Sequence, residues 1–198
     1  MKLLLGIPTT DYVHAEFVKS LCGLVNRLAE DEIKFETKII GGTLVYIARN
    51  KIAHYAIENE FTHVLWLDSD MTFGPGILDD LLFHGKEMVC GMFASRRPPY
   101  GSCVYSSIEG NNITKVEDFG TEPFKVAGCG FATVLTSVEL LNDVFKKFGT
   151  VFTPTTMYGE DLAFCKRVQD IGREIWCDPT VRPGHIAHIT VYAGGEQK

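Results

Sequence analysis

The 198-residue sequence lacks several features that would each point to a particular class of protein. Its six cysteines are widely spaced and none form a C-x-x-C pair, which argues against a zinc ribbon or a small disulfide-bonded scaffold. It also has no excess of positive charge, because 19 lysine and arginine residues face 25 aspartate and glutamate residues, for a net charge of -6. A general nucleic-acid-binding protein would carry a basic face, so we expect no nucleic-acid partner.

Long hydrophobic runs are missing as well. The apolar run in the segment from Met1 to Thr10 ends at Pro8, and it is too short for the core of a signal peptide or for a membrane span. We therefore expect no transmembrane segment, and a cytoplasmic protein with reduced thiols. With 45% hydrophobic and 22% charged residues, the chain is typical of a globular protein, and residues 1–198 suffice for one domain with a sizeable core.

The order of the apolar stretches predicts an α/β fold. A strand, a helix with apolar residues at helical spacing and a second strand open the chain, and this βαβ order predicts a mostly parallel sheet with right-handed crossovers. The polar segment 102–122 is typical of a mobile flap or a β-hairpin. We expect strands over 2–7, 35–40, 63–67, 87–93, the strand-like end of 126–135, and 175–177, and helices over 14–29, 44–59, 77–84, 138–148 and 158–171.

The chain is organised around the apolar strand 63–67 and the acidic residues that follow it. Because strand side chains alternate, Asp68 and Asp70 point the same way if the extended geometry persists, whereas Ser69 points the opposite way. Two such carboxylates repel each other unless a cation or a shared proton lies between them, and oxygen ligands favour Mg²⁺ or Mn²⁺. An acidic pair after a strand is also typical of a turn or a helix cap, so the motif alone leaves both interpretations open.

Two pairs of polar residues lie near helix starts, where they could meet a ligand. Arg49 and Asn50 fall in the first turns of helix 44–59, where an exposed guanidinium and amide could reach a ligand, although a solvated arginine is equally compatible. Glu160 and Asp161 open a later helix. Acidic residues there normally complement the helix dipole, but an exposed and fixed carboxylate could also act as a general base.

Three further signals come from loops. His185 and His188 lie in or beside a glycine-bearing turn and are candidates for a third metal ligand. Arg96 and Arg97, followed by two prolines, could hold a phosphate or an acceptor, with a solvated loop slightly favoured. The short G-x-G sequence that ends at Gly130 is a weak cofactor signal, and close packing against a sugar or another strand is the better explanation.

The ordered set of signals resembles glycosyltransferases of the GT-A fold, of the family-2-like type that includes small viral and bacterial members. The resemblance spans nearly the whole chain and implies a mostly parallel central sheet flanked by helices. It implies a nucleotide-binding half over 1–100 and an acceptor and catalytic half over 101–198. It is carried by Pro8-Thr9, Ala48-Arg49-Asn50, Asp68-Ser69-Asp70-Met71, Gly128-Cys129-Gly130-Phe131, Gly159-Glu160-Asp161-Leu162-Ala163-Phe164 and Gly184-His185.

The resemblance implies a metal-dependent transfer of a hexosyl or deoxyhexosyl group from a UDP- or GDP-linked sugar donor to a hydroxyl of a glycan or another acceptor. Asp68 and Asp70 match the D-x-D motif that holds Mn²⁺ or Mg²⁺ against the donor diphosphate, with Asp70 the more direct ligand. His185 matches the late histidine that completes the metal site, and His188 is the second choice.

Glu160 and Asp161 match the catalytic E-D pair, in which the aspartate is the base for an inverting transfer. The sequence lacks the Q-x-x-R-W acceptor motif of processive polysaccharide synthases, which favours a soluble single-transfer enzyme in the cytoplasm, or in the host cytoplasm if the source is a virus. The residues that the resemblance places at the nucleotide sugar are Pro8, Thr9, Asp11, Arg49, Asn50, Asp68, Ser69 and Gly130.

Other functions remain open at this point. The residues from Asp68 to Thr72 also match the D-x-D-x-T motif of phosphatase-like hydrolases, although such hydrolases usually begin with the motif and here a strand-helix-strand-helix unit precedes it. A non-catalytic nucleotide-sugar-binding module would keep Arg49 and the metal carboxylates but would not need Asp161. A nucleotidyltransferase is less favoured, because the chain lacks a glycine-rich, basic opening that would grip a triphosphate.

Overall fold

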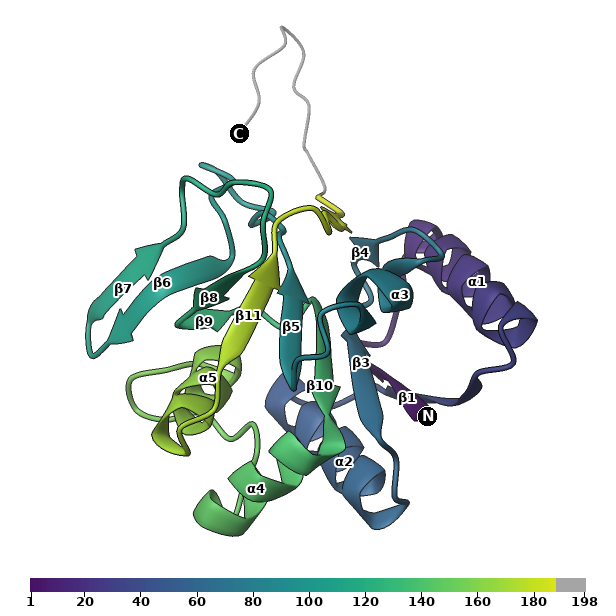
Figure 1. Ribbon diagram of the computed structural model, residues 1–198, viewed down its shortest axis with the longest axis horizontal. Coiled ribbons are helices and arrows are strands. Elements are labelled where there is room, and N and C mark those ends of the chain that lie inside the picture. Colours follow the sequence, from purple (N-terminus) through teal and green to yellow (C-terminus); the bar gives the residue numbers. More distant parts are fainter. Residues whose placement is uncertain (188–198) are drawn as a thin grey trace, which may run out of the picture.

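The computed structural model describes residues 1–187 and has a seven-stranded central sheet in the order β2-β1-β3-β10-β5-β11-β8 (Figure 1). Five strands run in one direction, and β10 and β8 run against them. The expected mostly parallel sheet flanked by helices is therefore confirmed. The strands are β1 (Lys2–Pro8), β2 (Lys34–Ile40), β3 (His63–Leu67), β5 (Met88–Gly91), β8 (Phe124–Val126), β10 (Thr133–Ser137) and β11 (Ile175–Asp178).

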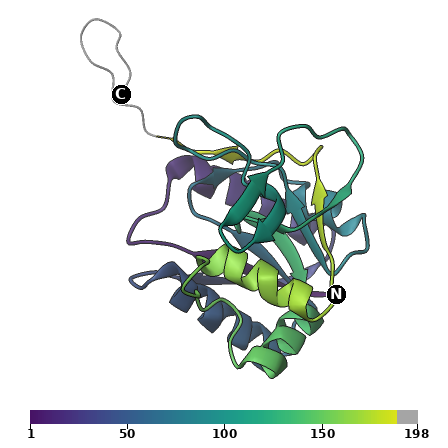
Figure 2. The same cartoon turned by 90° about the vertical axis from the view of Figure 1, so that its left-hand side faces the viewer.

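Helices cover both faces of this sheet. On β1, Leu3 and Leu5 pack toward α1 and α3, whereas Leu4 packs toward α2 on the opposite face. Gly6 allows α2 to approach closely, because a Cβ atom at this position would lie 2.9 Å from Ile52 Cγ2. Figure 2 shows α2, α4 and α5 side by side on their face. The helices are α1 (Ala15–Glu30), α2 (Val45–Glu58), α3 (Ile77–Leu82), α4 (Val138–Phe148) and α5 (Glu160–Asp170).

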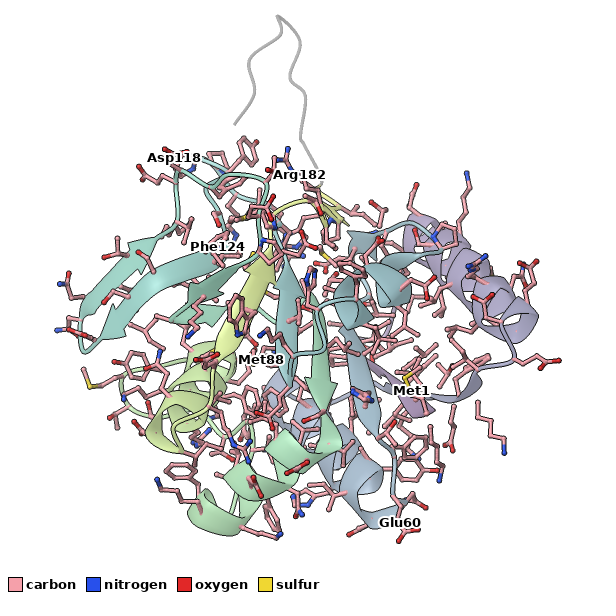
Figure 3. The ribbon with its side chains drawn as sticks, in the orientation of Figure 1. Met1, Glu60, Met88, Asp118, Phe124 and Arg182 are labelled. Atoms are coloured by element: carbon pink, nitrogen blue, oxygen red, sulfur yellow. The ribbon has the colours of Figure 1, made fainter. Side chains whose placement is uncertain are left out.

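The parallel strands end at a common edge of the sheet. Met88, which begins β5, lies low in the view of Figure 3, and Arg182, which follows β11, lies at the top. The loops that follow the parallel strands therefore gather at this upper edge, which is where open α/β sheets usually bind ligands.

Two small sheets extend the fold. The segment 102–122 contains a β-hairpin, one of the two expected forms, in which β6 (Val104–Glu109) pairs with β7 (Asn112–Lys115) and with β9 (Gly128–Cys129). The second sheet pairs β4 (Met71–Thr72) with β12 (Gly184–His185). This pairing, which local patterns do not predict, brings the end of the described chain beside the acidic motif. Within residues 1–187, no helix combines the length and apolar character needed to cross a membrane.

Candidate active site

The acidic motif leaves the sheet in a turn. β3 ends at Leu67, and the Asp68 N–H still donates to the Ala132 carbonyl at 3.0 Å. The Met71 N–H then donates to the Asp68 carbonyl at 3.2 Å, which closes the turn. The extended geometry therefore stops before Asp70, and the two carboxylates of the motif contact different partners.

Arg49 binds three carboxylates at once. Its Nη2 donates to Asp68 Oδ1 and Oδ2 at 2.9 and 3.2 Å. Its Nη1 donates to Glu160 Oε1 at 2.8 Å and to Asp161 Oδ1. Neither expectation for this residue, an exposed guanidinium or a solvated arginine, is met. Arg49 is 1% exposed, because it lies on the face of α2 that packs into the protein.

Two of the carboxyl groups that bind Arg49 have raised pKa values. The pKa of Asp161 is raised to about 7, chiefly because its partly enclosed position strips water from the charged form; Arg49 opposes the rise, and Glu160 and Asp68 add to it. Burial likewise raises the pKa of Asp68, against the charge of Arg49. A carboxyl group that titrates near neutrality is suited to accept a proton at physiological pH.

The second carboxylate of the motif, Asp70, faces two cationic groups. Arg96 Nη1 donates to Asp70 Oδ2 at 2.5 Å, and His185 Nε2 lies 3.3 Å from the same oxygen. Burial raises the pKa of Asp70, but the hydrogen bond from His185 and the charges of His185 and Arg96 hold it below its usual range. The sequence slightly favoured a solvated loop for Arg96, so sequence reasoning did not predict this contact with Asp70.

The orientation of His185 bears on metal binding. Its Nδ1 lies 2.9 Å from the Ala94 carbonyl oxygen, which can only accept a hydrogen bond, so Nδ1 carries the proton. In the neutral imidazole, Nε2 then presents a lone pair to Asp70, an arrangement that requires either a proton or a cation between the two groups. The hydrogen bond to Asp70 raises the pKa of His185 accordingly. An imidazole anchored through a backbone carbonyl is also the usual arrangement of a metal ligand.

The motif also lines a cavity of about 260 Å³, which we call the Thr9 hollow. The Thr9 hydroxyl lies 2.9 Å from Ser69 Oγ and so ties the end of β1 to the turn after β3. Five of the residues expected at the nucleotide sugar or metal therefore come together here. The lining residues are Pro8, Thr9, Thr10, Tyr12, His14, Thr43, Val45, Asp68, Ser69, Asp70 and Arg96.

The expected catalytic pair lines a separate cavity of about 160 Å³, the Tyr105 hollow. Gly130 lies there too, and a Cβ atom on it would come within 2.9 Å of Phe93 Cζ, so close packing explains the glycine. Sequence reasoning did not single out Tyr105, because half-buried tyrosines carry no distinguishing pattern. The lining residues are Tyr105, Gly130, Gly159, Glu160, Asp161 and Leu162.

The remaining expected residues lie away from these contacts. Asn50 Oδ1 accepts hydrogen bonds from the backbone N–H groups of Val151 and Phe152 at 3.2 and 2.8 Å, so its side chain holds the loop before α5. Asp11 is exposed on the loop whose neighbouring residues line the Thr9 hollow. His188 lies outside the described residues.

A larger cavity, of about 790 Å³, is lined by Met1, Lys2, Phe61, Thr62 and residues 32–36. It lies at the edge where β1 begins, and it contains none of the residues expected at the site. Within residues 1–187, no cluster of three or more His, Cys, Asp or Glu side chains is arranged to hold a metal ion. Asp70 and His185, two of the expected metal ligands, contact each other, but the described residues add no third such side chain around them.

Comparison of the sequence with protein-family models and with curated proteins finds no match. Solved structures do match. A197 from STIV has a TM-score of 0.64 and 17% identity, over 100% of this chain and 93% of that one. GalNAc-T7, crystallised with UDP, GalNAc and Mn²⁺, has a TM-score of 0.66 and 11% identity, over 99% of this chain and 45% of that one.

The catalytic domain of Drosophila beta1,4-galactosyltransferase 7, in complex with xylobiose, has a TM-score of 0.54 and 14% identity, over 91% of this chain and 66% of that one. The chain thus spans less than half of the GalNAc-T7 chain. These likenesses show that the protein has a GT-A glycosyltransferase fold, as its sequence motifs predict.

Proposed function

We propose that the protein is a metal-dependent, inverting glycosyltransferase that moves a sugar from a nucleotide-diphosphate donor to an acceptor hydroxyl. The observation that carries the proposal is the His185–Asp70 pair at the edge of the Thr9 hollow. His185 Nε2 and Asp70 Oδ2 lie 3.3 Å apart, and the Ala94 carbonyl holds the other ring nitrogen. Once His185 is neutral, the two atoms present two lone pairs to one cation, which takes the place of the proton between them. GalNAc-T7, which shares the fold, was crystallised with UDP and Mn²⁺, and this supports the same class of ligand.

The donor set suits Mn²⁺ or Mg²⁺. A carboxylate oxygen and an imidazole nitrogen are ligands that Mn²⁺ accepts, and a nucleotide diphosphate would supply further oxygens. Asp70 and His185 would hold the ion, with Asp68 beside them in the same hollow. When bound, the ion would neutralise the charge that develops on the leaving nucleoside diphosphate.

The Thr9 hollow is the proposed donor site. Pro8, Thr9 and Ser69 line it, so we assign them to the nucleotide sugar, with Asp11 at its rim. A UDP- or a GDP-linked donor is compatible with this lining. Gly130 lines the other hollow, so we assign it to the acceptor side instead.

The Tyr105 hollow is the proposed acceptor site, and Asp161 is the proposed base. In a direct displacement, the base removes the proton from the acceptor hydroxyl while the oxygen attacks the anomeric carbon from the side opposite the diphosphate, which inverts that centre. A pKa near 7 lets Asp161 be deprotonated at neutral pH and still bind the proton that it receives. Glu160, beside it, shares the contact with Arg49.

Calorimetry with UDP and with GDP, each with and without Mn²⁺, tests the proposal. We expect one nucleotide to bind only with the metal, and Asp70→Asn to abolish this binding because it removes a charged ligand. Asp118→Asn is the matched control, since Asp118 is exposed, lies in a loop at the upper edge in Figure 3 and lines neither hollow.

Failure of both nucleotides to bind in the presence of Mn²⁺ would refute the proposal. Phosphatase assays on Asp68→Asn would then test the D-x-D-x-T alternative. That alternative is less favoured, because Arg49 already occupies both oxygens of the would-be nucleophile.

A further inference from the structure

Arg49 contacts one lining residue of each hollow. Its Nη2 donates to Asp68, which lines the Thr9 hollow, and its Nη1 donates to Asp161, which lines the Tyr105 hollow. The side chains of these two aspartates are 28% and 30% exposed, whereas that of Arg49 is 2% exposed. The carboxylates therefore face the hollows, and the guanidinium lies beneath them with almost no surface left for a ligand.

The orientation of Arg49 is fixed by these contacts at a cost to its own hydrogen bonding. Its Nε is buried and has no hydrogen-bond partner among the described residues, while both Nη atoms are used. A buried donor without a partner is unfavourable, so the orientation is one that satisfies the carboxylates at the expense of the arginine. The planar guanidinium also packs over the Phe131 ring, 5.5 Å from its centroid. A fork of this shape can hold two groups in fixed directions, which a lysine ammonium cannot do.

The charges around Asp161 explain why it needs this partner. Glu160 precedes it on α5 and Asp68 faces it from the end of β3, and both disfavour its ionised form. Arg49, on α2, is the cation that opposes them. Tyr105 on β6 and Cys103 just before it also face Asp161. Burial raises the pKa of each, and the charge of Asp161 adds to the rise. The backbone N–H of Phe131 adds a hydrogen bond to the carboxylate.

We propose that Arg49 is a positioning residue that holds the base Asp161 in the acceptor hollow and the strand end at Asp68 in the donor hollow at a fixed separation, without contacting the nucleotide sugar. This inference rests on the proposed function for the meaning of the two hollows. It departs from the expectation that Arg49 faces the donor sugar or diphosphate, because the guanidinium is buried under its three carboxylate partners.

NMR titration of the ¹³C-labelled side-chain carboxyl groups tests the inference on the whole chain without any ligand. The signal of Asp161 is assigned by its loss in Asp161→Asn. We expect Arg49→Gln to raise the midpoint of Asp161 by about one pH unit or more, the size of effect that an adjacent opposite charge has on a carboxyl group. Arg49→Lys keeps the charge but not the fork, so we expect a smaller rise.

Arg96→Gln is the matched control, because it removes the other arginine of the site, which contacts Asp70 and not Asp161. We expect the Asp161 midpoint of this variant to coincide with that of the unmodified protein. Should Arg49→Gln fail to fold, Arg49→Lys carries the test. An Asp161 midpoint that does not move in the folded Arg49 variant would overturn the inference.

Nucleotide calorimetry on the same variants separates this inference from the proposed function. If Arg49→Lys loses nucleotide affinity while Asp161 titrates as before, Arg49 is a nucleotide contact and the inference is wrong. If no nucleotide binds to the unmodified protein but Asp161 responds to Arg49, the proposed function fails and the positional role of Arg49 toward Asp161 stands.

Discussion

Replacement of Asp161 by asparagine is the most direct perturbation of the proposed chemistry. The amide keeps the size of the side chain and its place beside Arg49, but it cannot accept the proton of an acceptor hydroxyl. Loss of a positioned base lowers a rate by about 10²–10⁴-fold, so we expect a fall in kcat of that size. Nucleotide and Mn²⁺ should still bind, because Asp161 lines the Tyr105 hollow and not the Thr9 hollow.

The same proposal predicts how the rate of the unmodified protein should change with pH. A base works in its deprotonated form, and the pKa of Asp161 is about 7. The rate should therefore rise with pH through neutrality and level off above it. One pH unit below the pKa, about a tenth of the base is deprotonated, so the rate should be about a tenth of its plateau.

The assay is the release of the nucleoside diphosphate from the matching nucleotide sugar, at several pH values and with a panel of glycan acceptors. Glu160→Gln is the control, because Glu160 shares the same helix start and the same arginine. We expect this variant to lose much less activity than Asp161→Asn. The assignment would be refuted if Asp161→Asn kept most of the rate, or if the rate of the unmodified protein were flat across neutral pH.

Two further predictions concern the metal and a residue that the structure assigns to stability. His185→Gln should raise the Mn²⁺ concentration needed for nucleotide binding by at least about tenfold, since the loss of even a supporting residue of a metal site lowers metal affinity by this factor. The control is His54→Gln, which removes a ring that packs on Phe145 and should leave this concentration unchanged. Equal responses of the two variants in calorimetry would contradict the role of His185. Asn50→Ala leaves two backbone N–H groups without their acceptor and should lower the free energy of unfolding by about 1–3 kcal/mol in urea titration, with nucleotide affinity retained. A loss of affinity without a loss of stability would instead place Asn50 at the nucleotide.

Local chemistry made much of the fold predictable. Helix 138–148 was expected at the bounds that α4 has, because both of its ends are set by neighbouring residues. Ser137 Oγ accepts a hydrogen bond from the Leu140 N–H at 3.1 Å, and Gly149 adopts a positive φ of 71° beyond the last turn. The β3 strand was equally clear, because a continuous apolar run ended in charged residues.

The contacts that define the site were not predictable, because they join distant parts of the chain. Arg49 and Asp161 are 112 residues apart, and no local pattern distinguishes an arginine that binds carboxylates from one in solvent. The pairing of β12 with β4, which places His185 beside Asp70, likewise depends on tertiary packing. Sequence reasoning could nominate each residue type for its chemistry, but only the fold shows which of them meet.

The two arginines of the site differ in burial and in the number of their carboxylate partners. This difference agrees with a donor site in which one cation can replace another. Arg49 is buried among its partners, and breaking a buried ion pair leaves charges that nothing compensates, so it stays in place. Arg96 is 51% exposed and pairs with a single oxygen of Asp70, and exposed pairs of this kind contribute little stability. If the proposed divalent ion binds, it would displace Arg96 from Asp70 at small cost, whereas Arg49 would stay beside the proposed base. The acidic site thus combines a permanent positive charge at Asp161 with a replaceable one at Asp70, where a nucleotide diphosphate would bring its own negative charge.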